Sequence, residues 1–414
     1  MIDVDEAQRI VLAHARPLPT EDVPLRDALY RTLAADVRCD VDNPPFDRSI
    51  MDGYAVRAAD TGRIANPAEC AKASATLRVA GRIAAGQQPR RPLQPGEAIR
   101  INTGAPIPPG ADAVVRVEDT ESANDGRDVL IRTAVEPGNF ITPRAAYVKA
   151  GDVVLQTGML LTPAEIGVAA GAGAAKLTVY RTPTVSILAT GDELVDVDQK
   201  PAGAQIRNSN QYQLEALVRS AHATPAVLGV ARDNRVELRR KVDEALLCDV
   251  CCITGGVSMG EFDFVPEVLA ECGVTIHFQK MAIKPGRPVI FGTTPRGGLV
   301  FALPGNPVSS FIGFELLVRP ALAALQGRPN ELPMFMPASL VGSLPPPGKR
   351  RAFMPARARL GHDGGWRVEP LRWHGSGDTF GLAGANVMIM RPPGAPPTRE
   401  GDSVSVLWIG GFAG

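Results

Sequence analysis

The sequence has no excess charge of either sign, because 44 Lys and Arg residues balance 44 Asp and Glu residues. A molecule without net charge has no overall field that would attract nucleic acid or an anionic membrane surface. We therefore expect neither partner, and we expect any anionic ligand to be held by a local site. With 414 residues and 45% hydrophobic positions, the chain is too long for one typical domain and can form several cores.

Long apolar runs are also missing from the sequence. The first ten residues contain Asp3, Asp5 and Glu6, and no later run approaches the ~18 apolar residues of a membrane helix. We expect a soluble, cytoplasmic protein with no membrane partner.

Cysteine and histidine are scarce, with six and five residues. So few cysteines make a poor disulfide framework. Cys248 and Cys251 form a C-x-x-C pair in an apolar run, but a zinc site needs four ligands and no second Cys or His pair lies nearby, so we favour buried packing. Five histidines leave little room for a histidine-based mechanism, and the sequence contains no Walker, G-x-S-x-G or H-E-x-x-H motif.

The apolar pattern predicts a multidomain α/β plus β protein. A small mixed domain is expected from residues 1–42 and 137–178, with an amphipathic helix over Val4 to Ala15 as one wall and a second helix after Thr162 as N-cap. Residues 43–136 have short apolar runs split by Gly, Pro and Asp turns, which predicts an inserted β domain. Residues 328–414 predict a terminal β domain, a small barrel or sandwich.

Residues 179–327 give the clearest pattern, because strand-like and helix-like segments alternate. This alternation predicts a mainly parallel, doubly wound α/β sheet. The expected strands are Val185–Ala189, Ala226–Val230, Val250–Ile253, Val274–Phe278, Val289–Phe291 and Leu299–Leu303, and the expected helices are Asn210–Ala221, Val236–Leu247, Phe264–Glu271 and Val308–Leu325.

Three of these strands end in turns rich in glycine or proline: Thr190-Gly191-Asp192-Glu193, Thr254-Gly255-Gly256-Val257-Ser258 and Pro304-Gly305-Asn306-Pro307. Ligands of open α/β sheets bind at the carboxyl ends of the strands, so these turns predict a crevice. The second turn would let backbone amides and the Ser258 hydroxyl approach a phosphate, although a tight strand exit also explains it. The third turn would present unpaired helix amides to an anion, and a purely structural helix start explains it almost as well.

Charged residues near these turns suit phosphate chemistry. Lys280 and Lys284 could clamp phosphates or an oxyanion, with a solvated basic loop as the alternative. Carboxylates that could bind Mg²⁺ follow in the same region, although turns favour Asp in any case: Asp192, Glu193, Asp233 and Asp263. Together these residues indicate cleavage or transfer at a phosphoanhydride or phosphoester, and their spacing says no more.

Several long motifs follow one another along the chain: Pro44-Pro45-Phe46-Asp47, Met51-Asp52-Gly53-Tyr54-Ala55-Val56, Thr103-Gly104-Ala105-Pro106, Gly110-Ala111-Asp112-Ala113-Val114-Val115, Thr190-Gly191-Asp192-Glu193-Leu194, Arg207-Asn208-Ser209-Asn210, Gly255-Gly256-Val257-Ser258-Met259-Gly260 with Asp263, Lys284-Pro285-Gly286, and Leu303-Pro304-Gly305-Asn306-Pro307-Val308-Ser309. In this order they make the chain resemble the molybdopterin molybdenumtransferases, which include the bacterial MoeA proteins and the E-domain of gephyrin. The likeness runs through nearly the whole length.

The resemblance implies a central molybdopterin-binding α/β domain, a C-terminal β barrel, and a homodimer in which the crevice of one subunit faces the inserted domain of the other. It implies insertion of molybdate into adenylylated molybdopterin, with Mg²⁺ held by Glu193 and Asp263 and with loss of AMP. A molybdopterin adenylyltransferase and acceptor molybdoenzymes are then possible partners. The site residues that it implies are Asp52 and Thr103 from the facing subunit, Glu193, Asp233, Asp263, Lys280 and Lys284 in the crevice, Pro304, Pro307 and Ser309 in the third turn, and Arg350 and Ser376 from the terminal domain.

One segment departs from the family pattern, which has an Arg followed by Gly-Glu-Asp before the second part of the first domain. Here Arg144 is present, but Ala145, Ala146 and Tyr147 follow and the acidic residue is missing. A weakened paralogue that binds molybdopterin or acts as a scaffolding dimer is therefore the alternative. A generic nucleotide pyrophosphatase would also explain the phosphate features, but it leaves the inserted and terminal domains without a role.

Overall fold

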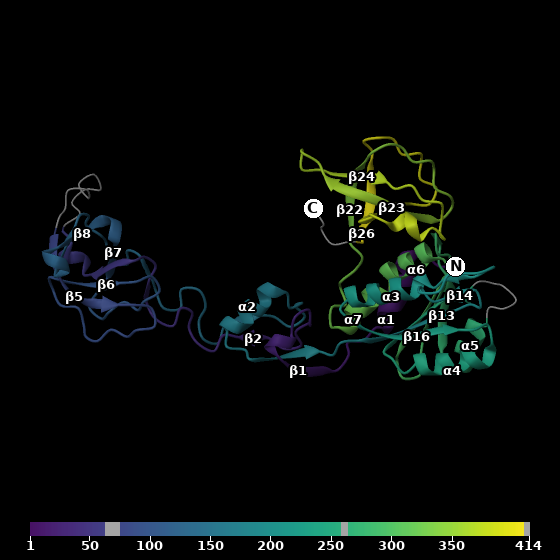
Figure 1. The fold of residues 1–414 in the computed structure, drawn as a ribbon, viewed down its shortest axis with the longest axis horizontal. Coiled ribbons are helices and arrows are strands. Elements are labelled where there is room, and N and C mark those ends of the chain that lie inside the picture. Colours follow the sequence, from purple (N-terminus) through teal and green to yellow (C-terminus); the bar gives the residue numbers. More distant parts are fainter. Residues whose placement is uncertain (63–74, 258–263, 410–414) are drawn as a thin grey trace.

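The computed structural model describes residues 1–62, 75–257 and 264–409. The molecule is elongated, with the inserted β domain at one end, a small domain in the middle, and the α/β and terminal β domains at the other end (Figure 1). Separate clusters of buried residues lie in these parts, so each has a core of its own.

The α/β domain contains a six-stranded sheet in the order β16-β13-β17-β21-β20-β18. The first four strands run parallel, and β20 and β18 are each antiparallel to the neighbour before them. The predicted mainly parallel sheet is confirmed. The strands are β13 (Thr184–Thr190), β16 (Thr224–Ala231), β17 (Val250–Thr254), β18 (Thr275–Lys280), β20 (Pro288–Thr293) and β21 (Leu299–Leu303).

Helices cover both faces of this sheet. Alternate residues of β17 belong to different cores, with Cys252 in one cluster and Cys251 and Ile253 in the other, because side chains of a strand point to opposite faces in turn. The sheet is therefore doubly wound, as predicted. The helices are α3 (Ser209–Ser220), α4 (Arg235–Ala245), α5 (Val265–Glu271), α6 (Pro307–Gly313), the π-helical segment η6 (Phe314–Val318) and α7 (Arg319–Leu325).

Among the described residues, one helical stretch, Pro307–Leu325, is long and apolar enough by length and composition to cross a membrane. The expectation that no run would approach this length is wrong. In this structure 89% of the stretch's most apolar window is buried, and its residues form the middle of the largest core cluster. Its buried Glu315 pairs with Arg319 across one helical turn, at 2.7 Å. The stretch occupies the position of a core helix.

The first helix, α1 (Val4–His14), does not form a wall of the small domain. It contacts α7 and η6, and its buried residues Val4, Ala7 and Val11 join the core of the α/β domain. The earlier interpretation is wrong because periodicity shows which face of a helix is buried and carries no information about what covers it.

Two chain segments pair to form the small domain. Strand β1 (Thr20–Pro24) pairs with β12 (Lys176–Tyr180), and β2 (Val37–Arg38) pairs with β11 (Val153–Leu155). Helix α2 (Pro163–Gly171) begins after Thr162 as expected, and the Glu165 carboxylate accepts a hydrogen bond from Thr162 N at 3.0 Å. The boundaries placed at residues 42/43, 136/137, 178/179 and 327/328 stay a prediction.

The inserted domain is a curled six-stranded sheet in the order β7-β4-β6-β5-β9-β8. Its strands are β4 (Gly53–Val56), β5 (Ala75–Ile83), β6 (Glu97–Ile101), β7 (Ala113–Arg116), β8 (Thr120–Ala123) and β9 (Asp128–Ile131). Shorter strands lie elsewhere in the chain: β3 (Arg48–Ser49), β10 (Ile141–Thr142), β14 (Leu194–Val195), β15 (Ile206–Arg207) and β19 (Ile283–Lys284).

The terminal domain is a closed barrel, which confirms the first of the two predicted architectures. Its strands pair in a ring, β22-β26-β25-β23-β24 and back to β22. Strand β19 of the preceding region adds to β23 in parallel and joins the barrel to the α/β domain. The barrel strands are β22 (Phe335–Leu340), β23 (Arg351–Leu360), β24 (Trp366–Pro370), β25 (Val387–Arg391) and β26 (Ser403–Trp408).

The C-x-x-C pair lies in and beside β17. Cys251 is 1% exposed, and burial raises the pKa of its thiol to about 12, so the group stays protonated and packs as an apolar side chain.

Candidate active site

The three glycine- and proline-rich turns meet at one edge of the sheet. Strands β13, β17 and β21 are parallel neighbours, so the turns that follow them leave the sheet on the same side. Gly255 has φ +95°, and a Cβ on it would lie 2.6 Å from the Thr190 carbonyl oxygen. Only glycine fits this position, because both the backbone conformation and the approach of the first turn exclude a side chain. A Cβ on Gly305 would lie 3.6 Å from Gly255 Cα, so the third turn is also in contact with the second.

Asn210, near the start of α3, holds the second and third turns together. Its Nδ2 donates to Thr254 Oγ1 and to the Gly305 carbonyl oxygen, both at 2.8 Å. Thr254 Oγ1 in turn donates to Pro304 O at 3.2 Å. Asn210 is 8% exposed, and its Oδ1 is buried with no hydrogen-bond partner among the described residues. Sequence reasoning did not give Asn210 a role, although it closes the motif Arg207-Asn208-Ser209-Asn210.

Carboxylates gather where β13 and β16 end. The Glu193 carboxylate folds back against Gly191, and Asp233 N donates to Asp192 Oδ1 at 3.2 Å. The Arg232 guanidinium, which the sequence analysis also missed, donates to Asp192 O at 3.0 Å and fastens the two turns together. Glu193 and Asp233 are therefore both brought to the crevice edge and both are exposed.

Whether these acids suit Mg²⁺ depends on how many carboxylates lie close together. Within residues 1–62, 75–257 and 264–409, no three His, Cys, Asp or Glu side chains are grouped closely enough to hold a metal by themselves. Mg²⁺ usually takes one or two carboxylates and completes its shell with water and ligand phosphates. The exposed oxygens of Glu193, Asp192 and Asp233 fit such a shared site, and Asp263 lies outside the described residues, as does Ser258.

The two lysines lie near β18, at the opposite end of the strand order from the carboxylates beside β16. Strand β18 runs in the same direction as β21, so Lys280 at its end lies on the same edge as the three turns. The segment from Lys284 continues into Gly286, where a Cβ would lie 3.4 Å from Ser309 O, so the lysine loop packs against the start of α6. Lys284 is exposed and Ser309 is buried.

The terminal barrel contributes to the same edge. Asn306 Nδ2 donates to Ser376 Oγ at 3.0 Å, and Val308 N donates to Ser376 O at 3.1 Å. Arg350 Nη1 donates to Ile283 O at 3.0 Å, next to Lys284. The structure thus places the expected residues Arg350 and Ser376 at the rim of the crevice.

Asp52 and Thr103 lie together, but in the inserted domain. Asp52 Oδ1 accepts hydrogen bonds from Thr103 N at 2.7 Å, and from Thr103 Oγ1 and Asn102 Nδ2 at 3.2 Å. The Thr103 backbone bond, followed by the Asn102 bond, lowers the pKa of this carboxyl group, so it stays ionised. In Figure 1 the inserted domain lies at the end of the molecule opposite the α/β domain. Within one chain these two residues are not part of the crevice.

The segment that departs from the family pattern, Arg144 to Tyr147, is held by contacts with residues 42–48. Arg144 forms an ion pair with Asp42, and its backbone N donates to Asp47 Oδ1 at 2.7 Å. The Tyr147 hydroxyl accepts a hydrogen bond from Arg48 Nη2 at 3.3 Å, and its ring lies beneath the same guanidinium. Arg144 is therefore anchored to acids close to it in space.

Comparison with known families covers most of the chain. Residues 2–173 match the MoeA N-terminal region (domain I and II), residues 186–324 match the probable molybdopterin binding domain, and residues 337–409 match the MoeA C-terminal region (domain IV).

Individual relatives agree with these matches. The molybdopterin molybdenumtransferase of Nostoc sp. is 37% identical over 94% of this chain and 89% of its own length. The Bacillus subtilis protein of the same name is 36% identical over 99% and 94%. The crystal structure of a molybdopterin biosynthesis moeA protein from Pyrococcus horikoshii OT3 has a TM-score of 0.81 and 30% identity, and the match covers 99% of this chain and 100% of that one. The chain belongs to the molybdopterin molybdenumtransferase family of molybdenum cofactor biosynthesis.

Proposed function

We propose that this chain inserts molybdate into adenylylated molybdopterin, with Mg²⁺-dependent release of AMP. The observation that carries the proposal is the junction of three strand-end turns with Lys280, the Glu193 and Asp233 carboxylates and Ser376 at one edge of the α/β sheet. Family membership supplies the substrate class, and the geometry supplies the groups that a phosphoanhydride needs.

Each group has a role that its chemistry suggests. Gly255 N donates to Leu303 O at 3.1 Å and holds the turn in place. The Gly256 amide is approachable because neither glycine carries a side chain, so it can donate to a phosphate oxygen. Lys280 and Lys284 neutralise negative charge that builds up as the phosphoanhydride is cleaved by water to AMP and the pterin phosphate. Glu193, with Asp263, would hold Mg²⁺, which supplies further charge neutralisation when bound. Arg350 and Ser376 would help hold the molybdate substrate.

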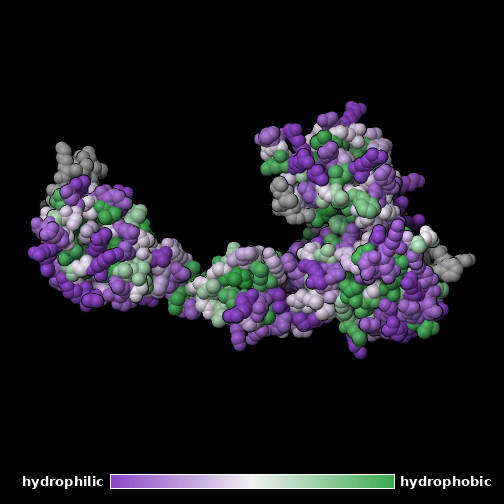
Figure 2. Space-filling view, in the orientation of Figure 1, coloured by the Kyte–Doolittle hydropathy of each residue, from purple (hydrophilic) through white to green (hydrophobic). Residues whose placement is uncertain are grey.

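We further propose a homodimer in which the inserted domain of one subunit closes the crevice of the other. Asp52 and Thr103 lie far from the crevice of their own chain, so they reach a crevice only in such an assembly (Figure 1). The small domain also exposes apolar side chains, visible as a green area around α2 in Figure 2. The exposed apolar side chains of this domain include Leu29, Val153, Met159 and Val168. Burial of such a patch between two copies would stabilise the dimer.

We place this reaction in the cytoplasm. The substrate chemistry requires an upstream molybdopterin adenylyltransferase and downstream acceptor molybdoenzymes, and we propose both as functional partners.

The test follows AMP release by the purified protein with adenylylated molybdopterin, Mg²⁺ and molybdate, together with reconstitution of a cofactor-free molybdoenzyme. Both are expected to require molybdate, and Asp263→Asn is expected to abolish AMP release. Undiminished turnover by that variant would refute the site assignment. Tight binding of the substrate by the wild type without AMP release would refute the transferase and favour a binding or scaffolding dimer, to which the Ala145–Tyr147 departure pointed.

A further inference from the structure

A cavity of about 800 Å³ opens on the inserted β domain, away from the crevice of the α/β domain. Its base is apolar, with Ile83 and Ile99 each nearly fully buried. Its polar lining consists of arginine and glutamine side chains from β5 and the loop that follows it: Arg82, Gln87, Gln88, Arg90 and Arg91. None of these side chains carries a negative charge.

The charges around the cavity do not cancel. Glu97 is buried and forms ion pairs with both Arg91, at 2.7 Å, and Arg78, so one carboxylate faces two guanidinium groups. Arg82 Nη2 donates at 3.2 Å to Asn102 Oδ1, which is neutral. Arg90 makes no hydrogen bond or ion pair with any described residue. The cavity therefore has a net positive charge in a protein whose overall charge is zero.

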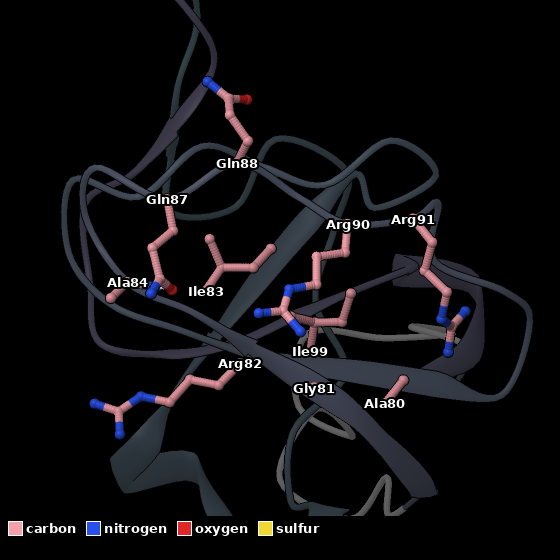
Figure 3. A pocket seen from close by; sticks show the side chains of 10 residues that line it. All are labelled: Ala80, Gly81, Arg82, Ile83, Ala84, Gln87, Gln88, Arg90, Arg91 and Ile99. Atoms are coloured by element: carbon pink, nitrogen blue, oxygen red, sulfur yellow. Dashed lines mark hydrogen bonds between the residues drawn. The ribbon is translucent and has the colours of Figure 1, made fainter.

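Arg90 lies at the centre of these donors. Figure 3 shows the Arg90 side chain reaching over Ile99, with Gln87 on one side and Arg91 on the other. Gln87 Oε1 accepts a hydrogen bond from Ala84 N at 3.0 Å, which fixes the amide and orients its Nε2 as a donor. Guanidinium and amide donors above an apolar base suit an anion with several acceptor oxygens, because hydrogen bonds from a charged donor to an oxyanion are stronger than those between neutral groups.

We propose that this cavity binds a tetrahedral oxyanion of charge near −2, either a free inorganic oxyanion or the phosphate group of a larger ligand, with Arg90 as its principal ligand. The cavity borders the Asp52–Thr103 pair, because the Asn102 side chain bonds to Arg82 at one end and to Asp52 at the other. The inference rests on the charge and shape of the inserted domain and does not require the proposed transferase activity.

The first test is equilibrium dialysis of the full-length protein at low salt with three probes: inorganic phosphate, molybdate and AMP. Arg90→Ala is expected to weaken binding at least about tenfold, since the charge-assisted bonds of one guanidinium group are lost, and raised salt is expected to weaken wild-type binding. Arg127→Ala is the matched control, because this arginine is exposed on the same domain and lies outside the cavity. Binding that depends on Arg90 separates the cavity from the α/β crevice. If only AMP shows it, the ligand is an organic phosphate, and if phosphate or molybdate shows it, the ligand is a free oxyanion.

The second test locates the anion. A crystal soaked in tungstate is expected to show anomalous density beside the Arg90 guanidinium, above Ile99. Density confined to the α/β crevice, or equal affinities for Arg90→Ala and wild type, would overturn the inference. If the wild-type protein bound the oxyanion in this cavity but released no AMP from adenylylated molybdopterin, the proposed transferase activity would be refuted and the anion site would not.

Discussion

Replacing Asn210 by Leu removes the side chain that joins two of the three crevice turns while keeping a similar volume. Two hydrogen bonds are lost, each contributing roughly 1 kcal/mol, and the buried Thr254 hydroxyl oxygen is left without this donor, which costs ~1–3 kcal/mol. We expect a local destabilisation of about 2–4 kcal/mol. Because the bonds lie between α3 and the ends of β17 and β21, the loss should be largest there.

Native-state hydrogen exchange measures this loss region by region. Protection of amides in α3 and β17 should fall by roughly 30- to 1,000-fold, as about 1.4 kcal/mol corresponds to tenfold. Phosphate or nucleotide binding in the crevice should weaken as the turns lose their relative position. Unchanged protection and unchanged binding would refute the role given to Asn210.

Asn234→Ala provides the matched control. Asn234 Oδ1 caps α4 by accepting from Val236 N at 2.9 Å and Glu237 N at 3.2 Å, on the exposed side of the domain. Loss of this cap costs about 1 kcal/mol and should reduce protection in α4 alone. If Asn234→Ala reduced amide protection in β17 as much as Asn210→Leu does, the effect of the Asn210 substitution would not be specific.

The remaining predictions concern ion pairs outside the crevice. The hydrogen bond from Arg91 holds the pKa of Glu97 at about 2 in the folded protein, so its stabilising effect is complete above pH ~4.5 and is lost as the pH falls toward 2. Glu97→Gln should therefore lower the melting temperature of the inserted domain at pH 6, and the difference from wild type should shrink over that range; a constant difference would contradict this account. Asp249 accepts two bonds from Arg181, at 2.6 and 3.0 Å, and two from Thr184, at 2.7 and 2.8 Å. Asp249→Asn should cost about 1–3 kcal/mol in urea unfolding of the α/β domain, and a change within error would contradict that role.

Local pattern was sufficient for most elements of secondary structure. Strand β21 was predicted with its observed bounds, Leu299–Leu303, because a continuous apolar run of this length between turns has few other interpretations. The crevice also followed from sequence, since the carboxyl ends of parallel strands must meet at one edge.

Only the tertiary structure decided which elements face each other. The α1 periodicity gave a buried face without naming α7 as its partner, and the apolar run Pro307–Leu325 has a composition that also suits a membrane. The roles of Asn210 and Arg232 were likewise hidden, because each bonds to residues that are distant in sequence. The sequence by itself determined the periodic elements and the glycine- and proline-rich turns that follow three of the strands, since both depend on near neighbours in the chain. The packing of α1, the basic cavity around Arg90 and the separation of Asp52 from its own crevice depend on long-range contacts, which a one-dimensional pattern does not encode.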